Sequence, residues 1–330
     1  MWPFFTPLFF MGLPVKIGIL SFTSLNQKKE NIGNIMLQKA ARDCGYKVRV
    51  YRHAHFQFTF DPNHPSLQYK NEPFAPPDVM IVRASVLTNV DSEVTIVKQL
   101  QLMGIPVINH YLPIVRAKNK VATMQILSHK GIPIPKTAVI HHVDNIDAAV
   151  QTIGRFPLII KMPQGSEGIG VSILESSRSL RSMLDLMENN FRNNLIIVQE
   201  YVKEAKGKDI RVFIVGGKIV AAMERKAKRG EFRSNFERGG SVSITDLSEE
   251  EKDISLQAAK AIGLDVAGVD VIRTVEGPKI LEVNANPGLE GITQATGINV
   301  AQHILMYAEK VGRQKRWLLI EKKEVAVESV

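Results

Sequence analysis

Two stretches near the carboxyl end of the chain decide the fold: Ala267-Gly-Val-Asp-Val-Ile272 and Glu282-Val-Asn-Ala-Asn-Pro-Gly288. Each carries the apolar residues of a buried strand, and the turn-forming Glu276-Gly277-Pro278 lies between them. This spacing predicts an antiparallel hairpin in which residues 266–274 pair with residues 279–284. Such a hairpin brings polar side chains from two strands together.

The polar side chains of this hairpin predict a metal site. Side chains alternate along a strand, so Glu282 and Asn284 share one face while Leu281 and Val283 face the core. Asp270 can lie on the same face, and its apolar neighbours would make an unpaired carboxylate costly. Two carboxylates and a carboxamide are the hard oxygen ligands that Mg²⁺ prefers, whereas the alternative is a solvated polar face.

A glycine-rich segment, Gln164-Gly-Ser-Glu-Gly-Ile-Gly170, lies between two apolar runs, the first of which ends in Lys161. Glycines let backbone N–H groups turn toward a phosphate, and a lysine supplies the point charge that phosphate oxygens need. The alternative is a flexible hairpin turn, which would leave Lys161 at the end of an apolar strand without an explanation.

The densest basic stretch runs from Glu224 to Gly240 and interleaves six cations with three acids and several glycines. We interpret it as a loop that handles phosphate and carboxylate groups. A nucleic-acid patch and a solvated loop remain alternatives, although the interleaved acids disfavour the first.

Strands and helices alternate through the first third of the chain. The expected strands are 15–20, 47–51, 79–82 and 106–109, with helices over 32–44 and 93–103 and a proline- and aromatic-rich loop over 53–77. This pattern predicts an α/β domain on a mainly parallel sheet. No G-x-G-x-x-G motif follows the first strand, so a dinucleotide-binding site has no support.

The remainder of the chain has an α+β pattern. A helix over 113–130 leads into β-rich runs that we expect to pair antiparallel: 157–161 with 170–174, 196–200 with 210–215, and 266–274 with 279–284. Gly216-Gly217 predicts a further hairpin turn. Helices are expected over 179–190, 249–262 and 298–310.

The composition is that of a globular protein of 330 residues with a formal net charge of +9, which suits anionic partners. A single cysteine, Cys44, excludes an internal disulfide and favours a reducing cytoplasm. Residues 1–14 form an apolar extension with three prolines, shorter than the roughly 20 residues of a membrane span. We expect this extension to be disordered, and we expect no membrane partner.

In this order, the motifs resemble the ATP-grasp superfamily and, within it, the RimK-type alpha-L-glutamate ligases of ribosomal protein modification. The resemblance covers about Val15 to Val311. It is carried by Arg116-Ala-Lys-Asn-Lys120, Gly165–Gly170, Gln199-Glu-Tyr-Val202, Asp209-Ile-Arg211, Arg225–Gly240, Asp270 and Glu282-Val-Asn-Ala-Asn-Pro-Gly-Leu-Glu-Gly291.

The resemblance implies an ATP-grasp fold of mixed α/β and α+β class. An N-terminal α/β (pre-ATP-grasp) domain would span 15–112, a central domain 113–200 and a C-terminal α+β domain 201–312, followed by a tail over 313–330. ATP would lie between the last two domains together with Mg²⁺ or Mn²⁺, as two ions.

The resemblance also implies roles for individual residues. Lys120 and Lys161 would approach the phosphates, Asp209 would hold the ribose, and Asp270, Glu282 and Asn284 would bind the metal. The full set of candidate nucleotide-binding residues is Lys120, Lys161, Gly165, Ser166, Glu167, Gly168, Gly170, Gln199, Glu200, Tyr201, Val202, Asp209, Arg233, Ser234 and Asn235.

Four arginines are candidates for holding substrate carboxylates, because a guanidinium group can bind a carboxylate with two hydrogen bonds. They are Arg211, Arg225, Arg233 and Arg238, and the sequence does not rank them.

The family chemistry joins a carboxylate to an amine with ATP, through an acyl phosphate. We therefore expect a cytoplasmic ligase that adds L-glutamate to an acceptor carboxylate such as the C-terminus of a ribosomal protein, acting as a homo-oligomer, tetramer or dimer. The alternatives are a small-molecule ligase of the same branch, a kinase-like phosphotransferase, and an RNA- or ribosome-binding module with a vestigial nucleotide site. The intact metal-ligand trio disfavours the RNA-binding alternative, so we expect no stable nucleic-acid binding.

Overall fold

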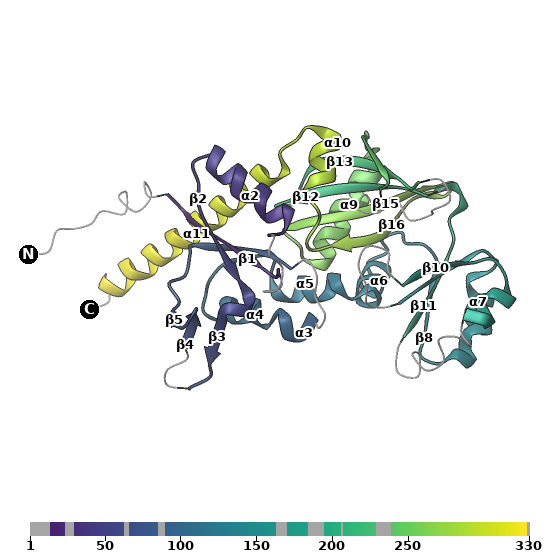
Figure 1. The fold of residues 1–330 in the computed structure, drawn as a ribbon, viewed down its shortest axis with the longest axis horizontal. Coiled ribbons are helices and arrows are strands. Elements are labelled where there is room, and N and C mark those ends of the chain that lie inside the picture. The colour runs from purple at the N-terminus through teal and green to yellow at the C-terminus, as the bar shows by residue number, and fades with distance from the viewer. Residues whose placement is uncertain are drawn as a thin grey trace, which may run out of the picture. The chain divides into compact units, whose positions relative to one another are not determined.

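The computed structural model describes residues 14–23, 30–62, 66–84, 90–162, 170–183, 195–205, 207–228 and 239–328. The chain divides into two compact units (Figure 1). Unit 1 comprises Met1–Val115, Asn286–Thr293 and Ile298–Val330, and unit 2 comprises Arg116–Ala285 and Gln294–Gly297. Both ends of the chain therefore contribute to unit 1.

A four-stranded parallel sheet forms the centre of unit 1, in the order β2-β1-β6-β7. Its strands are β1 (Lys16–Ser21), β2 (Lys47–Arg52), β6 (Val79–Arg83) and β7 (Val107–Ile108). The central strands β1 and β6 are buried along nearly their whole length, which explains their continuous apolar sequence. The predicted α/β domain on a parallel sheet is confirmed.

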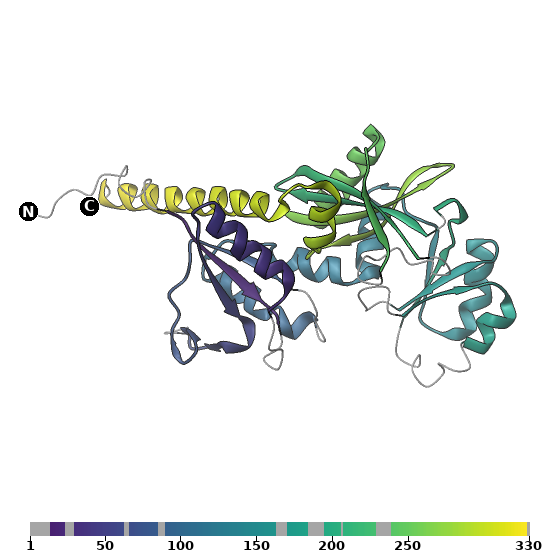
Figure 2. The same ribbon diagram turned by 45° about the horizontal axis from the view of Figure 1, so that its top comes forward.

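Helices of unit 1 pack on this sheet, and α2 and α11 lie side by side (Figure 2). The helices that belong wholly to unit 1 are α2 (Ile32–Asp43), α3 (Val90–Glu93), α4 (Thr95–Leu102) and α11 (Val300–Glu328), with a short 3-10 helix, η1 (His53–His55). The helix predicted over 298–310 thus extends to Glu328. α2 begins after Asn31, whose side chain accepts a hydrogen bond from the Gly33 backbone N–H.

The stretch predicted as a loop over 53–77 contains a small antiparallel sheet, so that prediction was wrong in part. Its strands are β3 (Phe56–Thr59), β4 (Ser66–Tyr69) and β5 (Glu72–Pro73). Phe56 and Tyr69 pair across β3 and β4 with ring centroids 4.9 Å apart. Such cross-strand aromatic pairs stabilise a short sheet. The prolines of this stretch instead predict a loop.

Unit 2 contains two antiparallel sheets. The first has the order β10-β9-β11-β8, with β8 (Thr137–Ile140), β9 (Leu158–Lys161), β10 (Val171–Leu174) and β11 (Ile196–Glu200). Apolar side chains of this sheet and of α7 (Ile146–Ile153) form one core, and the 3-10 helix η2 (Val143–Asn145) precedes α7. The predicted pairing of 157–161 with 170–174 is confirmed.

The second sheet has the order β14-β13-β12-β15-β16. Its strands are β12 (Lys208–Val215), β13 (Lys218–Lys226), β14 (Ser241–Ile244), β15 (Val266–Thr274) and β16 (Gly277–Asn284), and the 3-10 helix η3 (Lys203–Ala205) precedes them. α9 (Glu249–Ile262) packs on this sheet and opens with a capping box between Ser248 and Glu251. The hairpin at Gly216-Gly217 is confirmed, and so is the second hairpin, whose turn is Val275-Glu276 because Gly277 and Pro278 already belong to β16.

Two sequence predictions for this region were wrong. Residues 196–200 do not pair with 210–215, because β11 lies between β8 and β9 in the first sheet while β12 lies between β13 and β15 in the second. The helix predicted over 113–130 is two helices, α5 (Tyr111–Lys118) and α6 (Lys120–His129). Asn119 separates them, since its extended backbone and its side chain cap the N-terminus of α6. One further helix, α10 (Glu290–Thr296), follows β16.

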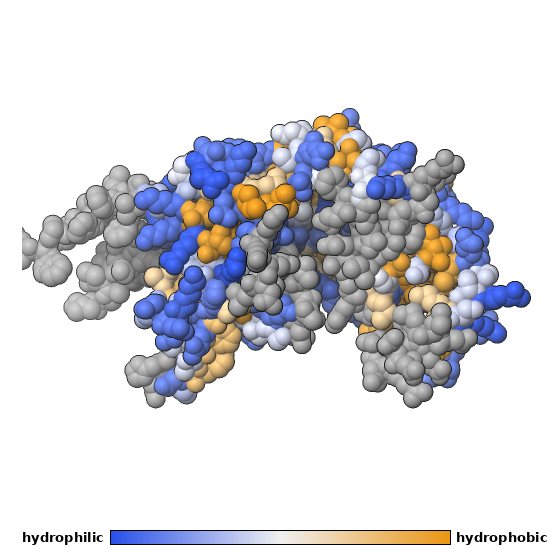
Figure 3. Space-filling view, in the orientation of Figure 1, coloured by the Kyte–Doolittle hydropathy of each residue, from blue (hydrophilic) through white to orange (hydrophobic). Residues whose placement is uncertain are grey.

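The surface visible in Figure 3 is mostly hydrophilic among the coloured residues, with hydrophobic side chains in scattered groups. Exposed apolar residues include Ile32 and Ile35 on α2 and Leu112 on α5. None of the helices that the structure describes has the length and apolar character required to cross a bilayer.

Candidate active site

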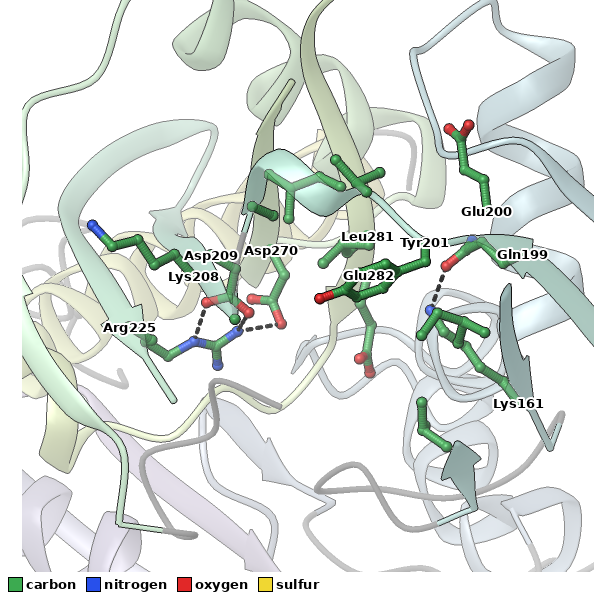
Figure 4. A pocket seen from close by; sticks show the side chains of 16 residues that line it. Lys161, Gln199, Glu200, Tyr201, Lys208, Asp209, Arg225, Asp270, Leu281 and Glu282 are labelled. Carbon is green, nitrogen blue, oxygen red and sulfur yellow. Dashed lines mark hydrogen bonds and ion pairs between the residues drawn. The ribbon is translucent and has the colours of Figure 1, made fainter. Parts of the chain in front are cut away.

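A cavity in unit 2 collects most of the predicted site residues that the structure describes (Figure 4). Its volume, counted with its open mouth, is about 860 Å³. Both sheets of unit 2 line it. The lining residues are Ile159, Lys161, Val171, Gln199, Glu200, Tyr201, Val202, Ala205, Gly207, Lys208, Asp209, Arg225, Asp270, Ile272, Leu281 and Glu282.

Lys161 ends β9 and places a cation in this cavity. Its Nζ donates a 2.6 Å hydrogen bond to Gln199 Oε1, and Gln199 Nε2 in turn donates to Thr137 Oγ1 at 2.8 Å. Burial, with a smaller contribution from nearby Lys120, lowers the pKa of Lys161 to about 8, although Glu282 and Asp270 partly oppose the shift. The lysine is held in place by a neutral carboxamide, which leaves its charge available to an anionic ligand such as a phosphate.

Lys120, at the start of α6, lines a neighbouring cavity together with Lys161, Gln199, Leu281 and Glu282. The structure therefore brings the two predicted phosphate-binding lysines to one part of unit 2. Two positive charges close together repel each other. A polyphosphate bound beside both lysines would remove this repulsion, so the pair is suited to such a ligand.

Four charged side chains of the second sheet form a chain of ion pairs, which we name the Arg–Asp tetrad: Arg211, Asp270, Arg225 and Asp209. Arg211 binds Asp270 through Nε and, at 3.0 Å, through Nη2. Arg225 binds Asp209 at 2.6 and 2.7 Å and also reaches Asp270 Oδ2 at 2.7 Å. The adjacent strands β13, β12 and β15 align these residues, because Asp209 is the register partner of Arg225 and Arg211 that of Asp270.

The tetrad keeps Asp270 and Arg225 ionised although both are buried. Burial raises the pKa of Asp270, but Arg211 and Arg225 outweigh it and hold that pKa below its ordinary value. Burial likewise lowers the pKa of Arg225, and Asp270 and Asp209 reverse this and raise it. Side chains of Arg225 and Asp270 are only 5% and 8% exposed, so this charge pattern is fixed in place.

Asp270 and Glu282 are register partners on β15 and β16, which confirms that they share a face. Leu281, however, was predicted to face the core and instead is partly exposed and lines the cavity. A β-bulge between Asp270 and Val271 inserts an extra residue in β16, so Leu281 and Glu282 both reach the cavity side. Asn284, the third predicted ligand, pairs with Gly268 and does not line this cavity.

The donor set fits a hard divalent cation bound with phosphate. Asp270 keeps its charge, Glu282 lies opposite it, and both line the same cavity as Lys161. Among the described residues no group of three or more His, Cys, Asp or Glu side chains has the geometry of a complete metal site. The two carboxylates therefore fit an ion that completes its coordination with substrate oxygens, in the manner of Mg²⁺.

The segment after β11 supplies the other wall. Glu200 accepts hydrogen bonds from the Lys136 backbone N–H and from Lys279 Nζ, both at 2.9 Å. Although burial raises the pKa of Glu200, these bonds lower it below its ordinary value. Tyr201 and Val202 follow and line the cavity.

Sequence reasoning missed the apolar walls of the cavity, formed by Ile159, Val171, Ile272 and Leu281. Ile159 lies two residues before Lys161 on β9, so strand alternation from Lys161 could have identified it. Leu281 could not be found in this way, because the bulge breaks the alternation.

Several predicted site residues lie outside the described residues: Gly165, Ser166, Glu167, Gly168, Arg233, Ser234, Asn235 and Arg238. Gly170 is described. Its φ of +72° is in the region that favours glycine, and an added Cβ would lie 3.1 Å from Met162 Cγ.

Of the arginines predicted to hold substrate carboxylates, Arg211 and Arg225 are described, and both already bind Asp270. Arg225 lines the cavity whereas Arg211 does not. Within the tetrad, both arginines therefore hold the carboxylate of Asp270 in position.

Comparison with known proteins identifies the family. The chain matches the RimK pre-ATP-grasp domain over residues 15–114 and the RimK-like ATP-grasp domain over residues 117–308. It is 40% identical to a "Probable alpha-L-glutamate ligase" of Vibrio vulnificus over 90% of this chain and 96% of that protein. A protein of the same name from Methanococcoides burtonii is 37% identical over 88% and 95% of the two chains.

Solved structures support the same fold. The ATP-grasp ligase PsnB, solved with a precursor variant, Mg and ADP, aligns with a TM-score of 0.69 at 15% identity over 90% of this chain and 98% of that one. D-alanine--D-alanine ligase of Bacillus anthracis, solved with ATP, aligns with a TM-score of 0.64 at 19% identity over 92% and 98%. The predicted ATP-grasp fold is confirmed, and the chain belongs to the RimK-like ATP-grasp family of ATP-dependent ligases.

Proposed function

We propose that this ligase joins L-glutamate to an acceptor carboxylate, with the C-terminus of a ribosomal protein as the nearest acceptor class. Relatives with 37% and 40% identity over most of the chain are named alpha-L-glutamate ligases, which supports the amino acid. The observation that carries the proposal is the cavity that Lys161 lines together with two carboxylates, Asp270 and Glu282.

The nucleotide would lie in this cavity, between the central domain, 113–200, and the C-terminal domain, 201–312. The adenine would contact the segment Gln199–Val202 and the apolar walls, and Asp209 would bind the ribose. Lys161 and Lys120 would neutralise phosphate charge. Asp270, Glu282 and Asn284 would hold Mg²⁺ or Mn²⁺, as two ions, which would supply positive charge to the phosphate groups when bound.

The reaction proceeds in two transfers. An oxygen of the acceptor carboxylate takes the γ-phosphoryl group and ADP leaves. The amine of glutamate then attacks this acyl phosphate, inorganic phosphate leaves, and an amide bond forms. A cation in a partly dry cavity stabilises the negative charge that develops in both transfers, which is the part we assign to Lys161.

The arginines divide into two groups in this proposal. Arg211 and Arg225 position Asp270, since both bind its carboxylate in the tetrad. Arg233 and Arg238 remain the candidates for binding substrate carboxylates directly, on the basis of the sequence alone.

The test is ligase activity of the purified full chain with ATP, Mg²⁺ and each proteinogenic amino acid in turn. We expect L-glutamate to give the largest release of ADP and phosphate, with an oligoglutamate or acceptor adduct in the mass spectrum. Glu282→Gln serves as the low-activity control at the same Mg²⁺ concentration, because it removes one carboxylate from the cavity with little change in shape. The absence of amino-acid-dependent ADP release for the whole panel would refute the proposal.

Isolated ribosomal proteins are the acceptor arm of the same experiment. A glutamyl adduct at a protein C-terminus supports the acceptor class, whereas free oligoglutamate alone assigns the enzyme to small acceptors. Light scattering on the purified protein then checks the proposed homo-oligomer, a tetramer or dimer.

A further inference from the structure

Unit 1 contains a buried arginine that the catalytic cavity does not use. Arg83 ends β6 and is only 5% exposed. Its Nη1 donates a 3.3 Å hydrogen bond to the carbonyl oxygen of Pro287, and its buried Nε has no hydrogen-bond partner among the residues that the structure describes. A guanidinium group has five N–H donors, and the buried Nε–H of Arg83 is one that remains available to a ligand.

No carboxylate of the described residues pairs with Arg83, and burial alone lowers its pKa to about 10. The side chain therefore remains a cation at neutral pH. The sequence segments that follow β1 and β6, residues 24–29 and 85–89, contain no Asp or Glu. A buried charge without a counter-charge destabilises the folded protein, so its presence marks a position where a ligand can supply the opposite charge.

The guanidinium group also lies at the positive end of a helix. Gly33 is the second residue of α2, and a Cβ atom added there would lie 2.5 Å from Arg83 Nη2. Glycine thus permits the close approach of Arg83 to the first turn of α2. The backbone N–H groups of that turn carry partial positive charge, which adds to that of the arginine.

The position in the sheet agrees with a ligand site. The chain passes from β1 to β2 on one side, while β6 lies on the other side of β1, so the strand order reverses between β1 and β6. Ser21 and Arg83 are register partners at the carboxyl ends of these strands. Ligands of open α/β sheets bind at this edge, at the point of reversal.

The charges around Arg83 favour a carboxylate over a phosphate. Glu30 precedes α2 and accepts hydrogen bonds from Ser21, Thr23 and Asn34 at 2.8–2.9 Å, which holds its negative charge near the same helix end. Glu30 is itself paired with Arg52 at 3.8 Å, so Arg83 and the helix end supply the positive charge at this place, about as much as one carboxylate neutralises. The planar fork of the guanidinium group matches the two oxygens of a carboxylate.

We infer that Arg83 and the first turn of α2 form a binding site for a carboxylate of the amino-acid or peptide substrate, separate from the nucleotide cavity of unit 2. The inference rests on the proposed function for the identity of the ligand. Pro287, which Arg83 contacts, follows the proposed metal ligand Asn284 by three residues in the chain.

The test follows the Nε–H resonance of Arg83 by NMR in the full chain with ¹⁵N-labelled arginine, assigned by its loss in Arg83→Lys. The probes are L-glutamate, the dipeptide α-L-glutamyl-L-glutamate and inorganic phosphate, each with Mg-ADP present. We expect a saturable shift with at least one carboxylate probe. The shift should be smaller in Gly33→Ala, whose added Cβ displaces the guanidinium group.

Steady-state kinetics provide the second readout. Arg83→Met should raise KM for one carboxylate substrate about tenfold or more, the effect of losing a charge-assisted hydrogen-bonded pair. KM for ATP should stay within about twofold, as in Arg42→Met, an exposed arginine of α2 that serves as the control. Without ligand, Arg83→Met should be at least as stable as the parent chain, because it removes an unpaired buried charge.

The outcomes separate the two proposals. Failure of both carboxylate probes to shift the Arg83 resonance overturns the inference, and so does a shift with phosphate alone. A carboxylate-induced shift in a chain that shows no amino-acid-dependent ADP release supports the site and refutes the glutamate ligase. Normal ligase kinetics in Arg83→Met, with a marked loss of stability, assigns Arg83 a structural part only and overturns the inference.

Discussion

Raising the pH from 7 to 9 should weaken the use of ATP, because Lys161 loses its proton in this interval. Burial places the pKa of Lys161 at about 8, below its ordinary value of 10.5. With that pKa, roughly nine-tenths of the molecules carry the charge at pH 7 and about one-tenth at pH 9. Since only the protonated lysine attracts phosphate, kcat/KM for ATP should fall about tenfold.

The assay is the initial rate of ADP release at low ATP and saturating Mg²⁺ across this pH range, because kcat/KM reports the ionisation of the free enzyme. In Lys161→Arg the decline should disappear, since a guanidinium group stays protonated throughout. Lys218→Arg, at an exposed lysine of β13, should keep the decline and serves as the matched control.

Stability should change with pH in the opposite direction. Between pH 8 and 10.5 the unfolded chain holds a proton on Lys161 that the folded protein has released, so the free energy of unfolding should rise with pH in this window. Lys161→Met should abolish that rise. A decline of kcat/KM that persists in Lys161→Arg, or a parent enzyme with a flat profile from pH 7 to 9, would refute the assignment of this lysine.

Three further predictions concern unit 2. Asp270→Asn removes the carboxylate that binds both Arg211 and Arg225. The free energy of unfolding, measured by urea denaturation, should therefore fall by about 3–5 kcal/mol, and ADP release should be lost. An RNA-binding module would instead keep its function in this variant. Glu282→Gln should raise the Mg²⁺ concentration for half-maximal activity by about tenfold or more, while the midpoint of urea denaturation changes little. An unchanged Mg²⁺ dependence would exclude Glu282 as a metal ligand. Ser248→Ala removes the N-cap of α9 and should cost about 1 kcal/mol in thermal unfolding with unchanged kcat, whereas an unchanged melting temperature would contradict the capping role.

The sequence by itself determined the elements that depend on neighbouring residues. The tight turn between β15 and β16 brings Asp270 and Glu282 into register, and the motif order that ends in Glu282-Val-Asn identified the ATP-grasp family. Local turn chemistry and strand alternation suffice for such pairs, because few residues separate the partners.

Only the tertiary structure decided which strands share a sheet and which charges meet. β11 and β12 follow one another in the chain but belong to different sheets. The partners of each strand depend on contacts with segments distant in sequence, which local patterns do not reveal. The bulge in β16 turned Leu281 into the cavity, and the adjacent strands β12, β13 and β15 assembled the Arg–Asp tetrad. Arg83 is the clearest case: its sequence neighbours are apolar, and its unpaired charge becomes visible only when β6 meets the first turn of α2. Burial and charge pairing are properties of segments distant in sequence, so no local pattern encodes them.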